Sequence, residues 1–221
     1  MTEIPDAEFL LPLFPLPNLV FFPQTRIPIH IFEPRYRQLV ADVMKRDQRF
    51  GIVLLQPGWE ADYLGAPPVH LCGTMGRIEH KVALDDERFN LILYGETRFR
   101  ILGEVEREPY RTVRVIARPQ IERTPAETYA QRTWLAELSQ QYLRFFPDQE
   151  SVPELGTASL EILTNALIIT LGLDVVEKQR LLEIDDLITR AESVAGELQG
   201  RIESLRFLAP YRHGGGDPRR N

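Results

Sequence analysis

The side chains able to act as nucleophiles, general bases or metal ligands are few in this sequence, and they lie far apart. Cys72 is the only cysteine, and the four histidines are His30, His70, His80 and His213. His70 and His80 fall on one strand-like run, but they are ten positions apart. At about 3.3 Å per residue, that spacing is too long for two ligands of one metal ion. We therefore expect no metal site.

Cys72 could serve as a nucleophile with one of the histidines as its base, which would make the protein a thiol hydrolase. The alternative is a small buried residue inside a strand, because free cysteine is among the most buried residue types. We favour this alternative. The adjacent acids Asp85, Asp86 and Glu87 could suggest a cation site. Without further oxygen ligands they are typical of a solvated hairpin turn instead.

Short catalytic and nucleotide-binding motifs are also missing. The sequence contains no GxxxxGKS/T, GxGxxG, HExxH, CxxC or GxSxG, the motifs of phosphate-binding loops, dinucleotide sites, zinc proteases, redox pairs and serine hydrolases. We therefore predict a protein that is not an enzyme, with no catalytic residues, no cofactor and no nucleoside triphosphate.

Composition narrows the class further. The 221 residues are 43% hydrophobic and 26% charged, enough for a sizeable core, and the net charge is −6. Neither half of the chain shows concentrated positive charge, which disfavours nucleic acid as a partner and leaves a local basic patch open. The acidic N-terminus and the proline-broken apolar run after it fit neither a signal peptide nor a membrane span. With a single cysteine, we expect a cytoplasmic protein, and the oligomeric state is left open.

Residues 10 to 118 have mainly the two-residue period of β-strands. Ile27, Ile29 and Ile31 alternate with other residues, which predicts a strand. Pro28 has no N–H for a ladder, so this strand lies at the edge of a sheet or its neighbour leaves that position unpaired. Pro34 suits the first position of a helix that follows directly.

A hairpin is predicted from Val69 to Tyr94, with a bulge or sharp bend at Gly95. Residues 56 to 68 form a loop whose large aromatic residues are Trp59 and Tyr63. About six strands with one helix indicate a closed or partly open barrel rather than a parallel sheet, because repeated crossover helices are missing.

The stretch from Pro12 to Pro15 matches PxxP, so it could be a docking peptide for an SH3-like partner. The large apolar residues around it, however, represent more surface than a solvated linker exposes, and burying each contributes about 1.5–3 kcal/mol. We favour a core strand.

Beyond residue 121 the period becomes helical. Capping boxes at Thr124 to Glu127 and at Asp174 to Glu177 begin two helices. Another helix runs from about Ala158 and ends at Gly172, and a last long helix starts near Asp185 or Asp186.

These patterns predict an α+β fold with two subdomains. Residues 1–120 form a β pseudo-barrel with one helix, and residues 121–210 form a four-helix bundle. Residues 211–221 have nothing to bury and are expected to be a disordered tail.

In four collinear stretches the sequence resembles the N-terminal substrate-recognition domain of ATP-dependent Lon proteases, a family that includes standalone bacterial proteins. The stretches are LPLFPLPNLVFFPQTRIPIHIFEPRYRQLV, GTMGRIEH, LILYGETRFRIL and EKQRLLEIDDLITRAE. The resemblance spans residues 10–206 and implies a PUA-like pseudo-barrel followed by a helical bundle. A complete Lon protease continues into an ATPase and a Ser–Lys protease domain, and we expect neither in this protein. The resemblance therefore implies polypeptide binding and not proteolysis.

We expect a non-catalytic module that binds unfolded or partner polypeptide through an apolar groove, where barrel and bundle meet. Trp59 and Tyr63 are the candidate contact residues, because aromatic residues on loops are enriched in binding surfaces. The alternative is that both side chains pack over the core. A second hypothesis is RNA binding, since PUA-like barrels are used in that way and two strands carry Arg98, Arg100, Arg111 and Arg114.

Overall fold

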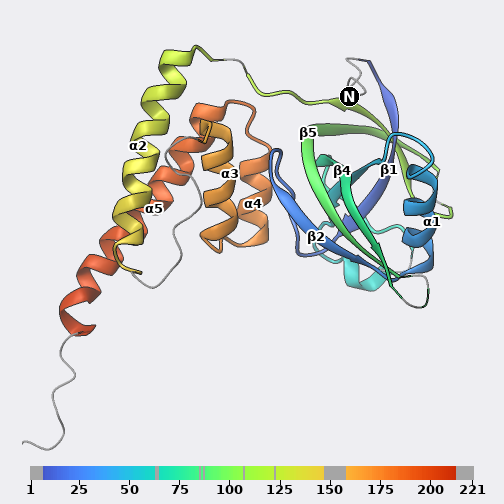
Figure 1. Ribbon diagram of the computed structural model, residues 1–221, viewed down its shortest axis with the longest axis horizontal. Coiled ribbons are helices and arrows are strands. Elements are labelled where there is room, and N and C mark those ends of the chain that lie inside the picture. Colours follow the sequence, from blue (N-terminus) through green and yellow to red (C-terminus); the bar gives the residue numbers. More distant parts are fainter. Residues whose placement is uncertain are drawn as a thin grey trace, which may run out of the picture. The chain divides into compact units, whose positions relative to one another are not determined.

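The computed structural model of the chain describes residues 7–62, 65–84, 86, 88–106, 108–121, 123–146 and 158–212, with side chains as far as residue 208. Within these residues it has a six-stranded mixed sheet, a short 3-10 helix and five α-helices (Figure 1). The predicted α+β class is confirmed. The described residues form two compact units: 1–121 with 168–185, and 122–167 with 186–221.

The sheet of the first unit closes on itself. Its strands are β1 (Phe9–Leu16), β2 (Arg26–Ile31), β3 (Arg49–Leu54), β4 (Cys72–Ala83), β5 (Phe89–Glu106) and β6 (Thr112–Ala117). The spatial order is β2-β5-β4-β3-β1-β6, and β6 also pairs with β5. Five strands therefore form a closed circuit, and β2 lies outside it. The pair β1 and β3 is parallel and the other pairs are antiparallel.

Strand β1 tolerates two prolines because it changes neighbour halfway along. Residues 9–12 pair with β6, whereas residues 13–16 pair with β3. Each half is bonded on one side, so the missing N–H of Pro12 or Pro15 can face away from the bonded neighbour. The stretch from Pro12 to Pro15 is thus part of a strand of the sheet, and Leu11, Leu13 and Phe14 are buried in the core.

The predicted edge strand and the helix after it are both present. β2 pairs with β5 alone among the described residues, with Pro28 opposite Ile92. Helix α1 (Pro34–Val43) begins at Pro34 as expected and buries one face, formed by Tyr36, Leu39, Val40 and Val43.

The predicted irregularity at Gly95 is a β-bulge. Met75 pairs with Thr97 and Gly76 pairs with Gly95, so Glu96 is the extra residue on β5. Its carboxylate accepts hydrogen bonds from Arg49 Nε at 2.6 Å and from Arg77 Nε at 3.0 Å. The bulge therefore directs a half-buried acid between two arginines of β3 and β4.

Two apolar clusters form the core of the first unit. One contains residues from all five strands of the closed circuit: Leu11, Leu13, Val53, Leu55, Val69, Met75, Phe99, Ile101, Val113 and Val115. The other packs α1 and β2 against the same sheet and contains Phe14, Phe21, Ile29, Ile31, Tyr36, Leu39, Val40, Val43, Phe50, Ile52, Ile78, Leu91 and Leu93.

The C-terminal helices are α2 (Pro125–Leu143), α3 (Leu160–Thr170), α4 (Val175–Leu182) and α5 (Leu187–Arg212). The capping box at Thr124 and Glu127 is complete, as predicted. The second box forms only in part: Asp174 accepts from the Glu177 N–H, but the Glu177 carboxylate is held by Arg180 at 2.7 Å and 2.9 Å. Gly172 ends α3 with a φ of +61°, a left-handed conformation that glycine adopts without strain.

Helix α4 groups with the sheet in the first unit, as do the last residues of α3. The sequence predicts these residues within one helical region, 121–210. The predicted domain boundaries and the four-helix bundle stay predictions, and the tail predicted at 211–221 lies almost wholly outside the described residues.

Candidate functional site

Of the two aromatic residues predicted as polypeptide contacts, the structure describes one. Trp59 begins the 3-10 helix η1 (Trp59–Asp62), where it is half-buried and packs against the apolar cluster inside the strand circuit. Tyr63 lies outside the described residues. Part of the Trp59 ring thus supports the core and part remains accessible, and its contact role stays a prediction.

Cys72 lies inside the first unit with 2% of its surface exposed. Burial raises the pKa of its thiol, and the charges of Arg118 and Arg98 offset this in part. A raised pKa disfavours the thiolate, which is the reactive form. Among the residues that the structure describes, no three His, Cys, Asp or Glu side chains are grouped closely enough to bind a metal ion.

Arg98, predicted as a possible RNA contact, is interior. Its side chain is 1% exposed and donates from Nη1 to the carbonyls of Leu182 and Ile184, each at 2.9 Å, and from Nη2 to the Pro119 carbonyl at 3.1 Å. The same guanidinium lies 3.1 Å from the Asp185 carboxylate. Arg98 therefore holds the end of α4 to β5 and is not available to phosphate.

The other arginines of that hypothesis are dispersed. Arg111 is bonded to Glu104 at 2.6 Å and to the Pro67 carbonyl at 2.8 Å. Arg114 pairs with Glu8 at 3.3 Å, and Arg100 is exposed. A row of solvent-facing arginines, as a phosphate backbone requires, is not formed by these four residues.

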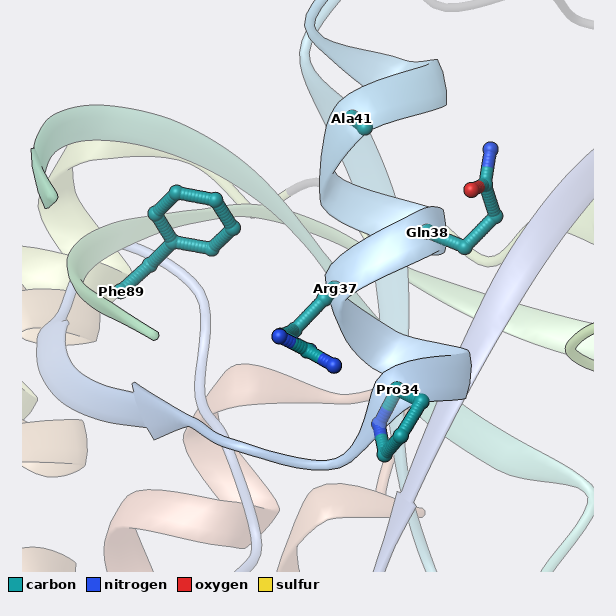
Figure 2. Close-up of a pocket in the computed structure, with 5 residues that line it drawn as sticks. All are labelled: Pro34, Arg37, Gln38, Ala41 and Phe89. Carbon is teal, nitrogen blue, oxygen red and sulfur yellow. The ribbon is translucent and has the colours of Figure 1, made fainter. Parts of the chain in front are cut away.

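One hollow of about 430 Å³ lies beside α1 and is lined by Pro34, Arg37, Gln38, Ala41 and Phe89. Figure 2 shows the Arg37 side chain extending between Pro34 and Phe89, while Gln38 points away from the phenyl ring. Arg37 donates to the Asp86 carbonyl at 3.2 Å, and the Gln38 amide donates to Asp42 at 3.0 Å.

The ring of Phe89 in this hollow also has a polar neighbour, since the Lys81 ammonium lies 4.1 Å from the ring centroid. Of these contacts, the hydrogen bond from Arg37 to the Asp86 carbonyl joins α1 to the turn between β4 and β5, whereas the Gln38 bond lies within α1 and the Lys81 contact lies within the hairpin. We interpret this hollow chiefly as a structural junction.

A second hollow, of about 510 Å³, lies between α2 and α5 in the second unit. It is lined by Tyr142, Phe146, Glu197, Gly200, Arg201, Ser204 and Leu205. The two helices lie side by side (Figure 1). We call this hollow the α2–α5 groove. The Tyr142 and Phe146 rings are 5.2 Å apart and form an aromatic wall, and the opposite rim carries the Glu197–Arg201 ion pair at 2.9 Å.

Gly200 lies on the wall of the α2–α5 groove and adds no side chain to it. A glycine inside a helix costs about 1 kcal/mol relative to alanine, so it calls for a compensating reason. Close packing is not that reason, because a Cβ atom built at Gly200 meets no heavy atom within 4 Å. The absent side chain instead leaves free space on the wall of the groove, one helical turn before Ser204.

Apolar side chains continue beyond the groove along α5. Leu208, one turn after Ser204, is 47% exposed, and Phe207 is 73% exposed. In the sequence, Tyr142 and Phe146 have the four-residue spacing of one helix face, and Gly200 is a residue that weakens a helix. The signal that could have indicated a groove is Gly200, a glycine inside an otherwise regular helix.

Solved structures identify this class of fold. The crystal structure of a Lon N-terminal domain protein from Xanthomonas campestris has a TM-score of 0.62 and 26% identity, over 85% of this chain and 98% of that chain. The N-terminal domain of a Lon protease from the Mycobacterium avium complex has a TM-score of 0.69 at 15% identity, over 86% of this chain and 98% of that one. The fold is that of a Lon N-terminal domain.

The family model of the ATP-dependent protease La (LON) substrate-binding domain matches residues 10–200, and the chain belongs to this family. Lon protease 2 of Myxococcus xanthus is 29% identical over 209 residues, which are 91% of this chain and 25% of that protein. The Lon protease of Anaeromyxobacter dehalogenans is 28% identical over 211 residues, 91% and 24% respectively. The chain thus spans about a quarter of the length of these relatives, and it matches the substrate-binding domain alone. None of the helices within the described residues is long and apolar enough to cross a membrane.

Proposed function

We propose that the protein binds unfolded or partner polypeptide without catalysing a reaction. The observation that carries this proposal is the match of the LON substrate-binding domain over residues 10–200. The buried thiol of Cys72 and the interior position of Arg98 both favour binding over thiol catalysis or RNA recognition. We place this activity in the cytoplasm, where a chain with one cysteine meets a reducing environment.

The α2–α5 groove is the binding surface that we favour. It offers an aromatic wall, free space at Gly200, and exposed apolar side chains further along α5. Such a surface suits large apolar side chains of an unfolded polypeptide, because each one buried contributes about 1.5–3 kcal/mol. Trp59 is a separate, secondary candidate. We also propose that the closed circuit of strands is a PUA-like pseudo-barrel, which the pairing of β6 with both β1 and β5 supports.

The test is fluorescence anisotropy with a fluorescein-labelled polypeptide that is reduced and alkylated so that it stays unfolded. We expect saturable binding by the wild-type chain. Gly200→Leu should weaken it at least about tenfold, because the leucine fills the groove and removes contacts of about 1.4 kcal/mol or more. Absence of binding by the wild-type chain would refute the proposed function.

Gly196→Leu is the matched control for the location of the site. Gly196 lies on the same helix and its Cβ direction is equally open, but it does not line the groove. Helical side chains lean towards the N-terminus, so a leucine there covers the turn before the groove. Equal losses of binding in both variants would reject the α2–α5 groove as the site. Trp59→Ala is assayed alongside: lost stability with unchanged binding would reject Trp59 as a contact.

A further inference from the structure

The outer edge of β2 has a definite pattern of backbone groups. Gly95 N donates to the Thr25 carbonyl at 3.0 Å, directly before the ladder in which Arg26 pairs with Tyr94 and Ile31 with Phe89. In an antiparallel ladder the bonded positions alternate along each strand. Ile27, Ile29 and Ile31 therefore bond to β5, and the backbone groups of Arg26, Pro28 and His30 point away from it.

These three outward positions are exposed. Arg26, Pro28 and His30 are all in the exposed class, and β2 has no partner besides β5 among the described residues. The edge offers the carbonyls of all three residues but the N–H groups of Arg26 and His30 only, because proline has none.

If position 28 carried a residue with a backbone N–H, the partner that best fits this edge would be a second copy of the chain. Two β2 strands placed antiparallel about a two-fold axis at residue 28 would pair Arg26 with His30 of the partner subunit, and residue 28 with itself. Each of these outward pairs would exchange two hydrogen bonds. The central pair lies on the axis, so proline at position 28 removes both of its bonds and places two rings in contact.

The sequence of β2, RIPIHI, shows why such protection matters. Its isoleucines favour strand pairing, it is an edge strand, and it has little net charge, which are the features of strands that associate edge to edge. We infer that Pro28 guards the β2 edge and prevents two copies of the chain from joining their sheets through β2. This role is independent of polypeptide binding at the α2–α5 groove.

The experiment compares the wild-type chain with Pro28→Val by light scattering coupled to size exclusion over a range of concentrations. Valine restores the outward N–H and favours strands. We expect Pro28→Val to form a species of about twice the wild-type mass. The wild type should reach that mass, if at all, only at a concentration about tenfold higher or more. Pro28→Thr, with a polar side chain on the exposed face, should behave in the same way, and it decides the result if the valine variant does not fold.

A rescue variant separates edge pairing from general stickiness. His30→Pro added to Pro28→Val removes the next outward N–H and keeps the backbone ladder with β5, at the cost of the 2.8 Å side-chain bond between His30 Nδ1 and Asn90 Oδ1. The double variant should therefore return to the wild-type mass. Circular dichroism and chemical unfolding confirm that each variant is folded. Unchanged mass in both single variants would overturn the inference, and so would a double variant that remains associated.

Discussion

The side-chain amide of Gln179 on α4 donates a 3.0 Å hydrogen bond to the backbone carbonyl of Cys72 on β4, 107 residues earlier in the chain. The same amide nitrogen donates to Glu183 at 2.7 Å. With Arg98, which bonds the carbonyls of Leu182 and Ile184, this contact fixes α4 to the sheet. The first unit is therefore completed by a segment that lies far from its strands in the sequence.

Removing the Arg98 guanidinium should strongly destabilise the protein. Arg98→Met keeps the apolar stem but leaves the carbonyls of Leu182, Ile184 and Pro119 without this buried donor. We expect a loss of about 3 kcal/mol or more in the free energy of unfolding, measured with urea. Arg100→Met, two residues along the same strand but exposed, should stay within about 0.5 kcal/mol of the wild type. Equal losses in the two variants would show that the Arg98 bonds contribute little.

Asp185 should make part of the stability depend on pH. Burial raises the pKa of its carboxyl group, but the hydrogen bond and charge of Arg118 and the charge of Arg98 outweigh burial, so the pKa is lowered. A group with a lowered pKa in the folded state stabilises above its unfolded pKa of about 3.9, and this contribution is lost as the pH falls through the folded value. Asp185→Asn should therefore be less stable than the wild type at pH 7, and the difference should shrink below about pH 4.

Urea unfolding of both proteins from pH 7 to pH 3 provides this measurement. Glu60→Gln is the control, because its exposed side chain forms no ion pair within the described part of the chain. A difference between wild type and Asp185→Asn that is constant over the whole range would contradict the assignment.

Gly200→Ala should stabilise the second unit. Its Cβ atom enters open space, and alanine is favoured over glycine inside a helix by about 1 kcal/mol. Thermal unfolding should show a higher midpoint, while Gly200→Leu tests binding as described above. A lowered midpoint for the alanine variant would mean that the helix needs glycine for its backbone, and would remove the argument that the space serves a ligand.

Gly95 should tolerate no side chain. A Cβ atom there would lie 2.3 Å from the Phe22 carbonyl oxygen, a backbone atom that also accepts a hydrogen bond from Thr25 Oγ1. Gly95→Ala should lower the free energy of unfolding by about 1–3 kcal/mol. Gly103→Ala on the same strand, whose nearest neighbour is Arg114 Nη2 at 3.8 Å, should change it by less than about 0.5 kcal/mol.

Local patterns were sufficient to predict most elements of the fold. The alternation of Ile27, Ile29 and Ile31 with Pro28 predicts an edge strand, and the Thr124 capping box predicts the start of α2, because both signals depend only on near neighbours. The long-range pairings could not be predicted in this way. Nothing local to β1 indicates that it passes from β6 to β3, since that change depends on where two distant strands lie.

Arg98 illustrates the same limit for the candidate site. On a strand, an arginine facing solvent and one facing a docked helix have the same sequence pattern, and only the position of α4 decides between them. The α2–α5 groove is also a product of two separate helices. On one helix alone, its aromatic residues are typical of core positions. Gly200 can be assigned to a groove only when Tyr142 and Phe146 are known to lie opposite it.

The discontinuity of the first unit has a consequence for synthesis on the ribosome. Translation proceeds from the N-terminus, so all six strands are made before Gln179 and Asp185 exist. Helix α2, which belongs to the second unit, emerges earlier than the segment that completes the first. Residues 122–185 must therefore be synthesised after the strands before Arg98 can bond the carbonyls of Leu182 and Ile184. The two units therefore cannot simply fold one after the other as each is synthesised.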